Sequence, residues 1–424
     1  MDGGKELISI IGILIAFFLV VYLLSQKKSL AVAMVSGSIV VGLTRNYNIM
    51  NNLGEFIPTI YKGISDPVAI ELVVLVALVS VFAYLMKETG LLNELIFVIK
   101  HYISNLYITM SIIPSIIGML PIPGGAIFSA PIIYPIGKKM NMTGAQMTSM
   151  NIYYRHLWYF SFPFLPSLII ASSLSGIQIS SIAIMHLPIV AIMILIGWFY
   201  YKSNISSQKN ISDDNLPKKL VNKTVKTKIT WKQLLKVMSP FIIVIVLPII
   251  SPIEFIMSLL IGIIFVITIK RDKFKLKMIV DGFDTKLTLG VAGIMIFRAF
   301  IGNSNGVYNI TNIFIEAGIP LIILAIVIPF IVGILTGNQT GAIGIVYPIL
   351  LILFTESSHY NLWHMIIYSS SYFGYILSPF HLCNLLTIEY FDTTLIKYYK
   401  EIMVPFFSAA VGVIIISLIY YNIL

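Results

Sequence analysis

The chain has 424 residues, of which 58% are apolar and only 11% are charged, whereas a typical globular domain has about 25% charged residues. Together with a mean hydropathy of +0.93, this composition excludes an ordinary soluble protein and predicts an all-α polytopic membrane protein. The single cysteine, Cys383, excludes intramolecular disulfides and multi-cysteine metal sites.

Apolar runs recur along nearly the whole chain and predict about ten transmembrane helices. We expect the first to be a transmembrane helix and not a signal peptide, because no small-residue cleavage site follows it and Lys27 and Lys28 mark its end. The predicted spans are 7–24, 30–44, 68–86, 150–172, 178–201, 237–250, 253–269, 287–302, 362–388 and 402–423.

The basic residues are distributed unevenly between the two predicted sides of the membrane. The loops on one side hold 23 of the 28, and only Lys5, Arg45 and Lys62 fall on the other. By the positive-inside rule the basic side is cytoplasmic, so we expect a multi-pass protein of the inner (plasma) membrane with both termini outside. The net charge of +10 then reflects topology and contact with membrane lipid, and nucleic acid is not an expected partner.

A polar segment at 202–236 divides the chain into halves and is predicted to be a basic cytoplasmic linker. Each half, 1–201 and 237–424, contains an apolar segment that Gly and Pro interrupt in the middle, at 107–137 and at 319–354. Each is long enough for two half-length helices. We therefore predict two re-entrant hairpins with tips near the membrane midplane, where irregular backbone is tolerated only inside protein or beside a cavity.

The two halves match in the order of their features. A Tyr-Pro pair follows each hairpin tip, and then Pro163 interrupts the span 150–172 in the first half as Pro379 interrupts 362–388 in the second. Five spans per half give the second half the opposite orientation. This pattern predicts an inverted repeat, in which paired interrupted segments mark a transport site at the midplane.

Segments without such interruptions are predicted to surround the site. Helices within 7–44 and 237–269 should form a scaffold that is separate from the hairpins. The stretches 88–103 and 303–317 mix polar and apolar residues at helical spacing, and we expect them to lie along the two membrane interfaces as arms.

Arg155 and His156 lie within a predicted span and are the first candidates for a binding site. An arginine at a span centre costs about 2.5–3.5 kcal/mol on insertion scales, and its guanidinium suits a carboxylate or a phosphate. The alternatives are that Arg155 reaches the cytoplasmic surface or pairs with an acid, and that His156 is a hydrogen-bonded structural residue.

The second half contributes candidates at the hairpin tip and at the helix break. His381 follows the break at Ser378, and a half-helix begins at the tip, where backbone N–H groups favour an anion. Polar side chains there also serve as caps or interhelical bonds in many proteins. The predicted substrate-binding residues are Pro123, Gly124, Gly125, Arg155, His156, Gly337, Asn338, Gln339, Thr340, Ser378, His381 and Asn384.

The remaining polar residues and motifs give weaker indications of function. Glu71 lies inside a span; the alternatives are that it carries a proton or sodium and that it pairs with Arg298 or another helix. His359 and His364 flank a span without enough nearby carboxylates to indicate a metal site. No nucleotide-binding, zinc-protease or hydrolase motif occurs, so we predict no catalytic residues, no metal, no cofactor and no enzyme activity.

Four strings together suggest a family: LPIPGGAIFSAP, NIYYRHLWYFSFPFLP, TGNQTGAIGIVYPIL and SPFHLCNLLTIEYF. With these, nearly the whole chain resembles an uncharacterised prokaryotic membrane family, a domain of unknown function of the ion transporter superfamily. Its architecture is similar to divalent-anion/sodium symporters and gluconate permeases. The resemblance implies an elevator-type transporter and a homodimer. It implies no substrate, because the Ser-Asn-Thr motifs of the symporters are absent from both tips.

The expected function is secondary active transport by alternating access, coupled to sodium or protons. Positive half-helix ends together with Arg155, His156 and His381 favour a small anionic solute. The alternatives are an ion channel with re-entrant loops and an intramembrane enzyme, which would need a cluster of catalytic groups that the sequence does not display.

Overall fold

The computed structural model describes most of the chain, and every regular element in the described part is a helix. This confirms the predicted all-α class. Of the predicted arm at 303–317, only its ends lie within the described part. The described residues are 2–45, 53–103, 105–122, 125–206, 231–251, 254–304 and 316–423.

Six described helices are long and apolar enough to cross a membrane, which is typical of a multi-pass membrane protein. The count of ten spans stays a prediction, because the other four predicted spans fold as shorter or interrupted helices. The six helices are α1 (Asp2–Ser25), α5 (Pro67–Glu88), α11 (Ile179–Ser206), α12 (Trp231–Ile250), α15 (Thr285–Gly302) and α21 (Leu395–Ile423).

Shorter helices accompany them. Helix α4 (Phe56–Ser65) has apolar residues concentrated on one side, and α6 (Leu91–Tyr102) lies within the predicted arm at 88–103. Lys270 and Glu94 form an ion pair that joins the end of α13 (Phe255–Ile269) to α6. Three further helices are short: α2 (Leu30–Thr44), α13 and α14 (Lys277–Asp281).

Two helix pairs correspond to the predicted hairpins. The first helix pair is α7 (Leu106–Gly118) with α8 (Ala126–Lys139), and the second is α17 (Leu321–Thr336) with α18 (Gln339–Leu350). Gly337 ends α17 with a left-handed backbone, φ 58°, which costs glycine little because it has no Cβ. The left-handed backbone of Gly337 therefore lets the chain turn directly from α17 towards α18.

Each helix pair is followed by an interrupted segment. In the first, α9 (Gly144–Arg155) ends before a short 3₁₀ turn, Leu157–Tyr159, and α10 (Pro166–Ser175) begins at a proline. In the second, α19 (Tyr360–Leu377) stops at Ser378 and α20 (Leu382–Tyr390) begins after Pro379. Proline lacks the N–H that would continue a helix, which accounts for the end of α19 just before Pro379, whereas α9 ends eight residues before Pro163.

The helix pairs and interrupted segments pack both within and across the halves. Within each half, α7 packs against α9, and α17 packs against α19. Across the halves, α8 packs against α20, and α18 packs against α10. Each interrupted segment thus contacts both helix pairs, and the residues at the breaks are brought towards one region.

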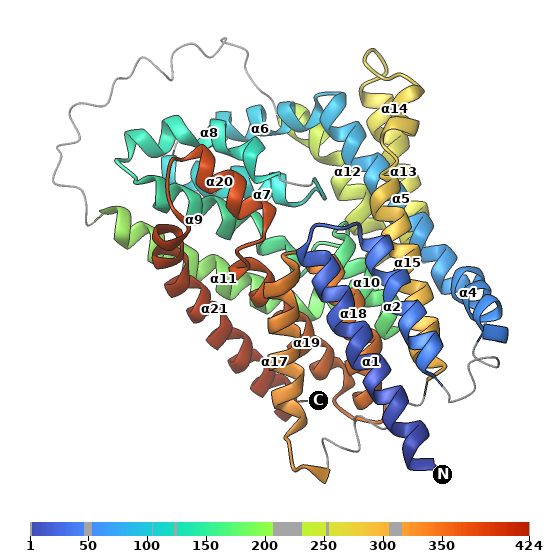
Figure 1. The fold of residues 1–424 in the computed structure, drawn as a ribbon. Helices are drawn as coiled ribbons and strands as arrows, with labels where there is room; N and C mark the ends of the chain where they lie inside the picture. Colours follow the sequence, from blue (N-terminus) through green and yellow to red (C-terminus); the bar gives the residue numbers. More distant parts are fainter. Residues whose placement is uncertain are drawn as a thin grey trace.

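The helices outside this region pack in two groups. Helix α2 packs against α1 and α15, while α12, α13 and α5 pack together, and α5 also contacts α15. In Figure 1, α6, α8 and α14 lie at the end of the molecule opposite to the two chain termini. The interior is filled with apolar and aromatic side chains, including Phe82, Phe164 and Phe241.

Candidate substrate site

The tip of each helix pair lies against the break of the interrupted segment in its own half. A Cβ atom built on Gly125 would lie 2.2 Å from Nη2 of Arg155, and one built on Gly337 would lie 2.8 Å from the carbonyl carbon of Phe380. Only glycine permits approaches this close. Of the other predicted residues at the first tip, Pro123 and Gly124 lie outside the described residues.

Arg155 is buried in protein at the end of α9. It is 2% exposed, and its Nη2 donates one hydrogen bond to the carbonyl oxygen of Ile122, at 3.1 Å. Among the described residues, its Nε and Nη1 have no hydrogen-bond partner and the guanidinium forms no ion pair. Arg155 therefore neither extends to a surface nor pairs with a described acid, and a buried cation in this state attracts an anion.

Helix α9 begins earlier than the sequence predicts, which explains where Arg155 lies. Thr143 and Gln146 form a capping box that satisfies the first free N–H groups and starts the helix at Gly144. Its twelve residues end at Arg155. Arg155 and His156 are consequently at the break itself and not inside a continuous helix.

His156 and His381 face each other from the two halves. Their ring centroids are 4.9 Å apart at 76°, and both side chains are buried. Nδ1 of His156 lies 2.7 Å from the carbonyl oxygen of Ile152, and its Nε2 lies 3.4 Å from the hydroxyl of Tyr375. Neither ring nitrogen of His381 has a partner among the described residues, so His381 has unused hydrogen-bonding capacity.

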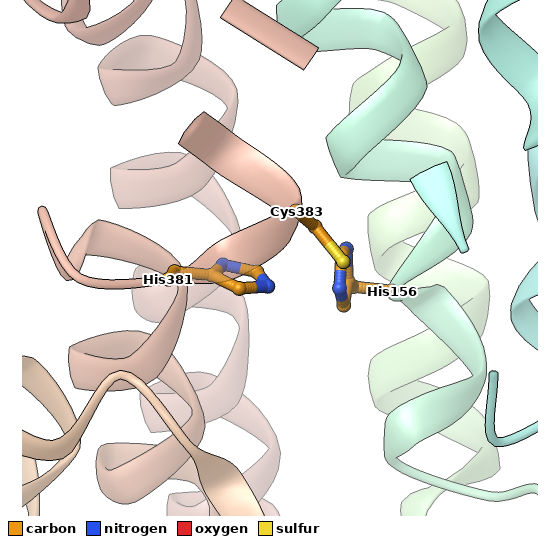
Figure 2. A group of neighbouring side chains, drawn as sticks. All are labelled: His156, His381 and Cys383. Atoms are coloured by element: carbon orange, nitrogen blue, oxygen red, sulfur yellow. The ribbon is translucent and has the colours of Figure 1, made fainter. Parts of the chain in front are cut away.

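Cys383 completes a cluster with these two histidines. Figure 2 shows its sulfur beside the ring of His156, with the ring of His381 pointing towards both. One ligand atom from each of the three residues lies within 4.8 Å of the others. Such a set can bind a metal, or its donors can contact a solute.

Among the described residues of the second tip, Gln339 is the side chain with a buried donor that has no partner. Gln339 is 2% exposed; its Oε1 accepts a hydrogen bond from Ser371, at 3.4 Å, while its Nε2 has no partner. Asn338 is exposed and caps α18 by accepting from the N–H of Gly341. Thr340 is half-buried. The capping alternative therefore describes Asn338, whereas Gln339 fits a binding role.

Ser378 and Asn384 hold the second break together. The hydroxyl of Ser378 donates to the carbonyl oxygen of Ile334, at 2.5 Å. Nδ2 of Asn384 donates to the carbonyl oxygen of Ile376, at 2.8 Å, and its Oδ1 accepts from the hydroxyl of Tyr398. The polar groups of these side chains already form hydrogen bonds within the protein. They therefore position the break, and few of their donors and acceptors remain for a solute.

Sequence reasoning missed three residues at the site: Asn151, Tyr375 and Cys383. Asn151 ties α9 to the first helix pair, because its Nδ2 donates to the carbonyl oxygen of Ala126, at 2.9 Å, and its Oδ1 accepts from Ser129. The sequence could have indicated Asn151, because it lies one helical turn before Arg155 on the same face of α9. Cys383 and Tyr375 flank Pro379 but have no distinctive spacing.

Glu71, for which the sequence allows more than one role, lies away from the candidate substrate site. Glu71 lines a cavity of about 600 Å³ together with Ser172 and Glu254, and none of the described substrate-binding candidates lines it. The structure records no ion pair between Glu71 and Arg298 in the described chain. A second cavity, about 500 Å³, has an almost wholly apolar lining between α17, α19 and α21.

The two histidines that flank a predicted span have separate neighbours. His364 contacts Tyr347, whose hydroxyl lies 3.2 Å from its Nδ1, and its ring stacks near His186. His359 instead stacks on Tyr421, with ring centroids 4.6 Å apart. These neighbours give no support to a metal site at His359 and His364.

Comparison with models of known protein families shows which family the chain belongs to. The model of a family described as "protein of unknown function (DUF401)" matches residues 9–423. The chain belongs to the DUF401 family. This match, together with the apolar helices, confirms the predicted membership of a membrane family of unknown function. No curated protein matches the DUF401 chain.

Proposed function

We propose that this DUF401 protein is a secondary active transporter that binds a small anion at Arg155. The observation that carries the proposal is the buried guanidinium with two unpartnered nitrogens and no described acid beside it. Leaving a cation buried without a partner costs several kcal/mol. An anionic solute that accepts hydrogen bonds from Nε and Nη1 offsets this cost and so binds in preference to a neutral or cationic one.

The surroundings of Arg155 support a site for a solute as large as a small carboxylate. Gln339 offers its free Nε2 from the second tip, and His381 offers a ring N–H from the second break. Donors from both halves then reach one region, because each interrupted segment packs against both helix pairs. Donors held in place by packed helices lose little entropy on binding.

The repeated arrangement supports alternating access in place of a fixed pore. In our proposal the two helix pairs are re-entrant hairpins that enter from opposite sides of the membrane. Movement of hairpins and interrupted segments together against a scaffold, as in an elevator, would expose the site to each side in turn. The superfamily, the coupling ion, sodium or a proton, and the homodimer belong to the same proposal. A channel needs no such pairing of opposed segments.

The test is a thermal-shift screen of the purified wild-type protein with organic acids, sugar acids, inorganic anions and amino acids, each with and without sodium. A ligand that binds only the folded state raises the unfolding midpoint by mass action. We expect stabilisation by one class of anion. Stabilisation by cations or neutral lipid alone would contradict the proposal.

Two matched variants locate the binding site in the same screen. Arg155→Gln should abolish the stabilisation by the anion, because it removes the buried charge. Arg298→Gln changes another arginine within the apolar helices, half-buried and with an unpartnered Nη1, and should leave it intact. Equal loss in both variants would show that the site is not at Arg155.

A further inference from the structure

Three potential metal ligands from two distant parts of the sequence meet in the core. His156 comes from the end of α9, whereas His381 and Cys383 come from the start of α20 (Figure 2). Their exposed fractions are 0%, 2% and 6%, and their ligand atoms lie within 4.8 Å of one another. Burial protects such a set from competing water and from adventitious ions.

His156 is held in the state that a metal requires. Because its Nδ1 lies 2.7 Å from the carbonyl oxygen of Ile152, the proton of the neutral ring belongs on Nδ1 and the lone pair on Nε2. Histidines that bind metals are commonly fixed by such a bond from their other nitrogen to a carbonyl. Its Nε2 lies 3.4 Å from the hydroxyl of Tyr375.

His381 supplies the second, independent observation. Both of its ring nitrogens are buried without a partner in the described chain, and a buried unsatisfied polar group destabilises the fold. Its ring points into the space shared with His156 and Cys383 (Figure 2). A bond from one nitrogen to a metal would supply the missing partner for its lone pair.

Charge and ligand type together select the ion. Thiolate and imidazole ligands favour Cu(I) and Zn(II) among biological metals. With one thiolate, a Cu(I) site is neutral, whereas a Zn(II) site keeps one positive charge close to the unpaired Arg155. Two histidines and one cysteine also form the trigonal set found in copper sites. Cu(I) therefore fits this surrounding better than Zn(II).

We propose that His156, His381 and Cys383 bind one Cu(I) ion. Binding converts the Cys383 thiol into a thiolate and releases its proton to solvent. The ligand atoms have to approach to roughly 3.5–4 Å of one another, since metal–ligand bonds to nitrogen and sulfur are about 2.0–2.3 Å. The inference goes beyond the proposed anion transport and does not depend on it.

The first experiment measures copper binding to the purified full-length protein under anaerobic, reducing conditions, in competition with a coloured Cu(I) chelator. We expect one Cu(I) per wild-type chain. Cys383→Ser and His381→Ala should each lose the ion to the chelator at a concentration that the wild type withstands. His359→Ala removes a half-buried histidine outside the cluster and should retain one equivalent.

A second measurement needs no variant and so does not depend on how the substitutions fold. X-ray absorption at the copper edge of the loaded wild-type protein should show one sulfur and two nitrogen neighbours. A spectrum without a sulfur neighbour overturns the proposal. So does a wild-type protein that takes up Zn(II) but not Cu(I), or a Cys383→Ser variant that keeps a full equivalent of copper.

Discussion

Arg155 and Gln339 each keep a buried donor that has no partner among the described residues. Each is packed so tightly that water has little access, with 2% of its surface exposed. A hydrogen bond from a solute to such a donor recovers the cost of its burial. The specificity of the site therefore depends on a few individual atoms, and single substitutions can separate binding from folding.

The first prediction concerns two neighbouring residues at the second tip. Gln339→Ala removes the free Nε2, so it should weaken substrate binding by about 1–3 kcal/mol with little effect on stability. Asn338→Ala removes the cap of α18, so it should cost about 0.5–2 kcal/mol of stability and leave affinity unchanged. Ligand titration and thermal unfolding of both variants check this. Unchanged affinity in Gln339→Ala together with weakened affinity in Asn338→Ala would contradict the prediction.

A second prediction concerns the contact between Gly125 and the guanidinium. Gly125→Ala places a methyl group 2.2 Å from Nη2 of Arg155, so the arginine must move and anion binding should fall at least tenfold. Gly302→Ala is the control, because a Cβ there meets nothing within 4 Å. Ligand affinity of both variants is the readout. If Gly125→Ala binds like the wild type, Arg155 does not bind the anion in the position described.

At the scale of elements, the backbones of α17 and α19 approach each other closely. A Cβ on Gly374 would lie 2.0 Å from the carbonyl oxygen of Phe330, and the hydroxyl of Ser370 donates to the carbonyl oxygen of Ile326. Small residues at such contacts let backbones approach, which is how helices associate within lipid. The contact makes α17 and α19 a single packed unit.

The prediction at this scale is that Gly374→Ala destabilises the protein. Forcing a methyl group into a packed contact costs about 1–3 kcal/mol, so the unfolding midpoint in detergent should fall. Gly54→Ala, where a Cβ meets nothing within 4 Å, should leave the midpoint unchanged. An unchanged midpoint for Gly374→Ala would mean that the two helices are further apart than described.

The elements also show how far sequence reasoning reaches. Pro163 and Pro379 lie in the two interrupted segments, as the local pattern predicts. Proline alone does not locate an interruption, because Pro188 and Pro329 lie inside continuous helices. The start of α9 at Gly144 depends on the capping box of Thr143, which apolar runs do not reveal. The meeting of His156 with Cys383 depends on packing between distant segments, and no local pattern encodes that.

At the scale of the whole molecule, the ends of the described fold differ in charge. Helix α14 and the lysines around it lie at the end opposite to the two termini (Figure 1). Loops rich in Lys and Arg stay in the cytoplasm during insertion. We therefore expect α14 to lie in the cytoplasm and α4, with Lys62, to lie outside.

Accessibility of single cysteines tests this orientation. In a background in which Ser replaces Cys383, Lys62→Cys should react with a membrane-impermeant thiol reagent added to intact cells. Lys277→Cys is exposed on α14 and should react only after the cells are opened. Labelling of Lys277→Cys in intact cells, with protection of Lys62→Cys, would reverse the proposed topology.

Concentrative uptake tests the central claim most directly. Wild-type protein in sealed proteoliposomes, given the anion that stabilises it and an inward sodium or proton gradient, should accumulate that anion above its external concentration. Collapse of the gradient should release it, and Arg155→Gln vesicles should accumulate none. Uptake that only equalises the two concentrations, or equal accumulation by Arg155→Gln, would contradict secondary active transport at this site.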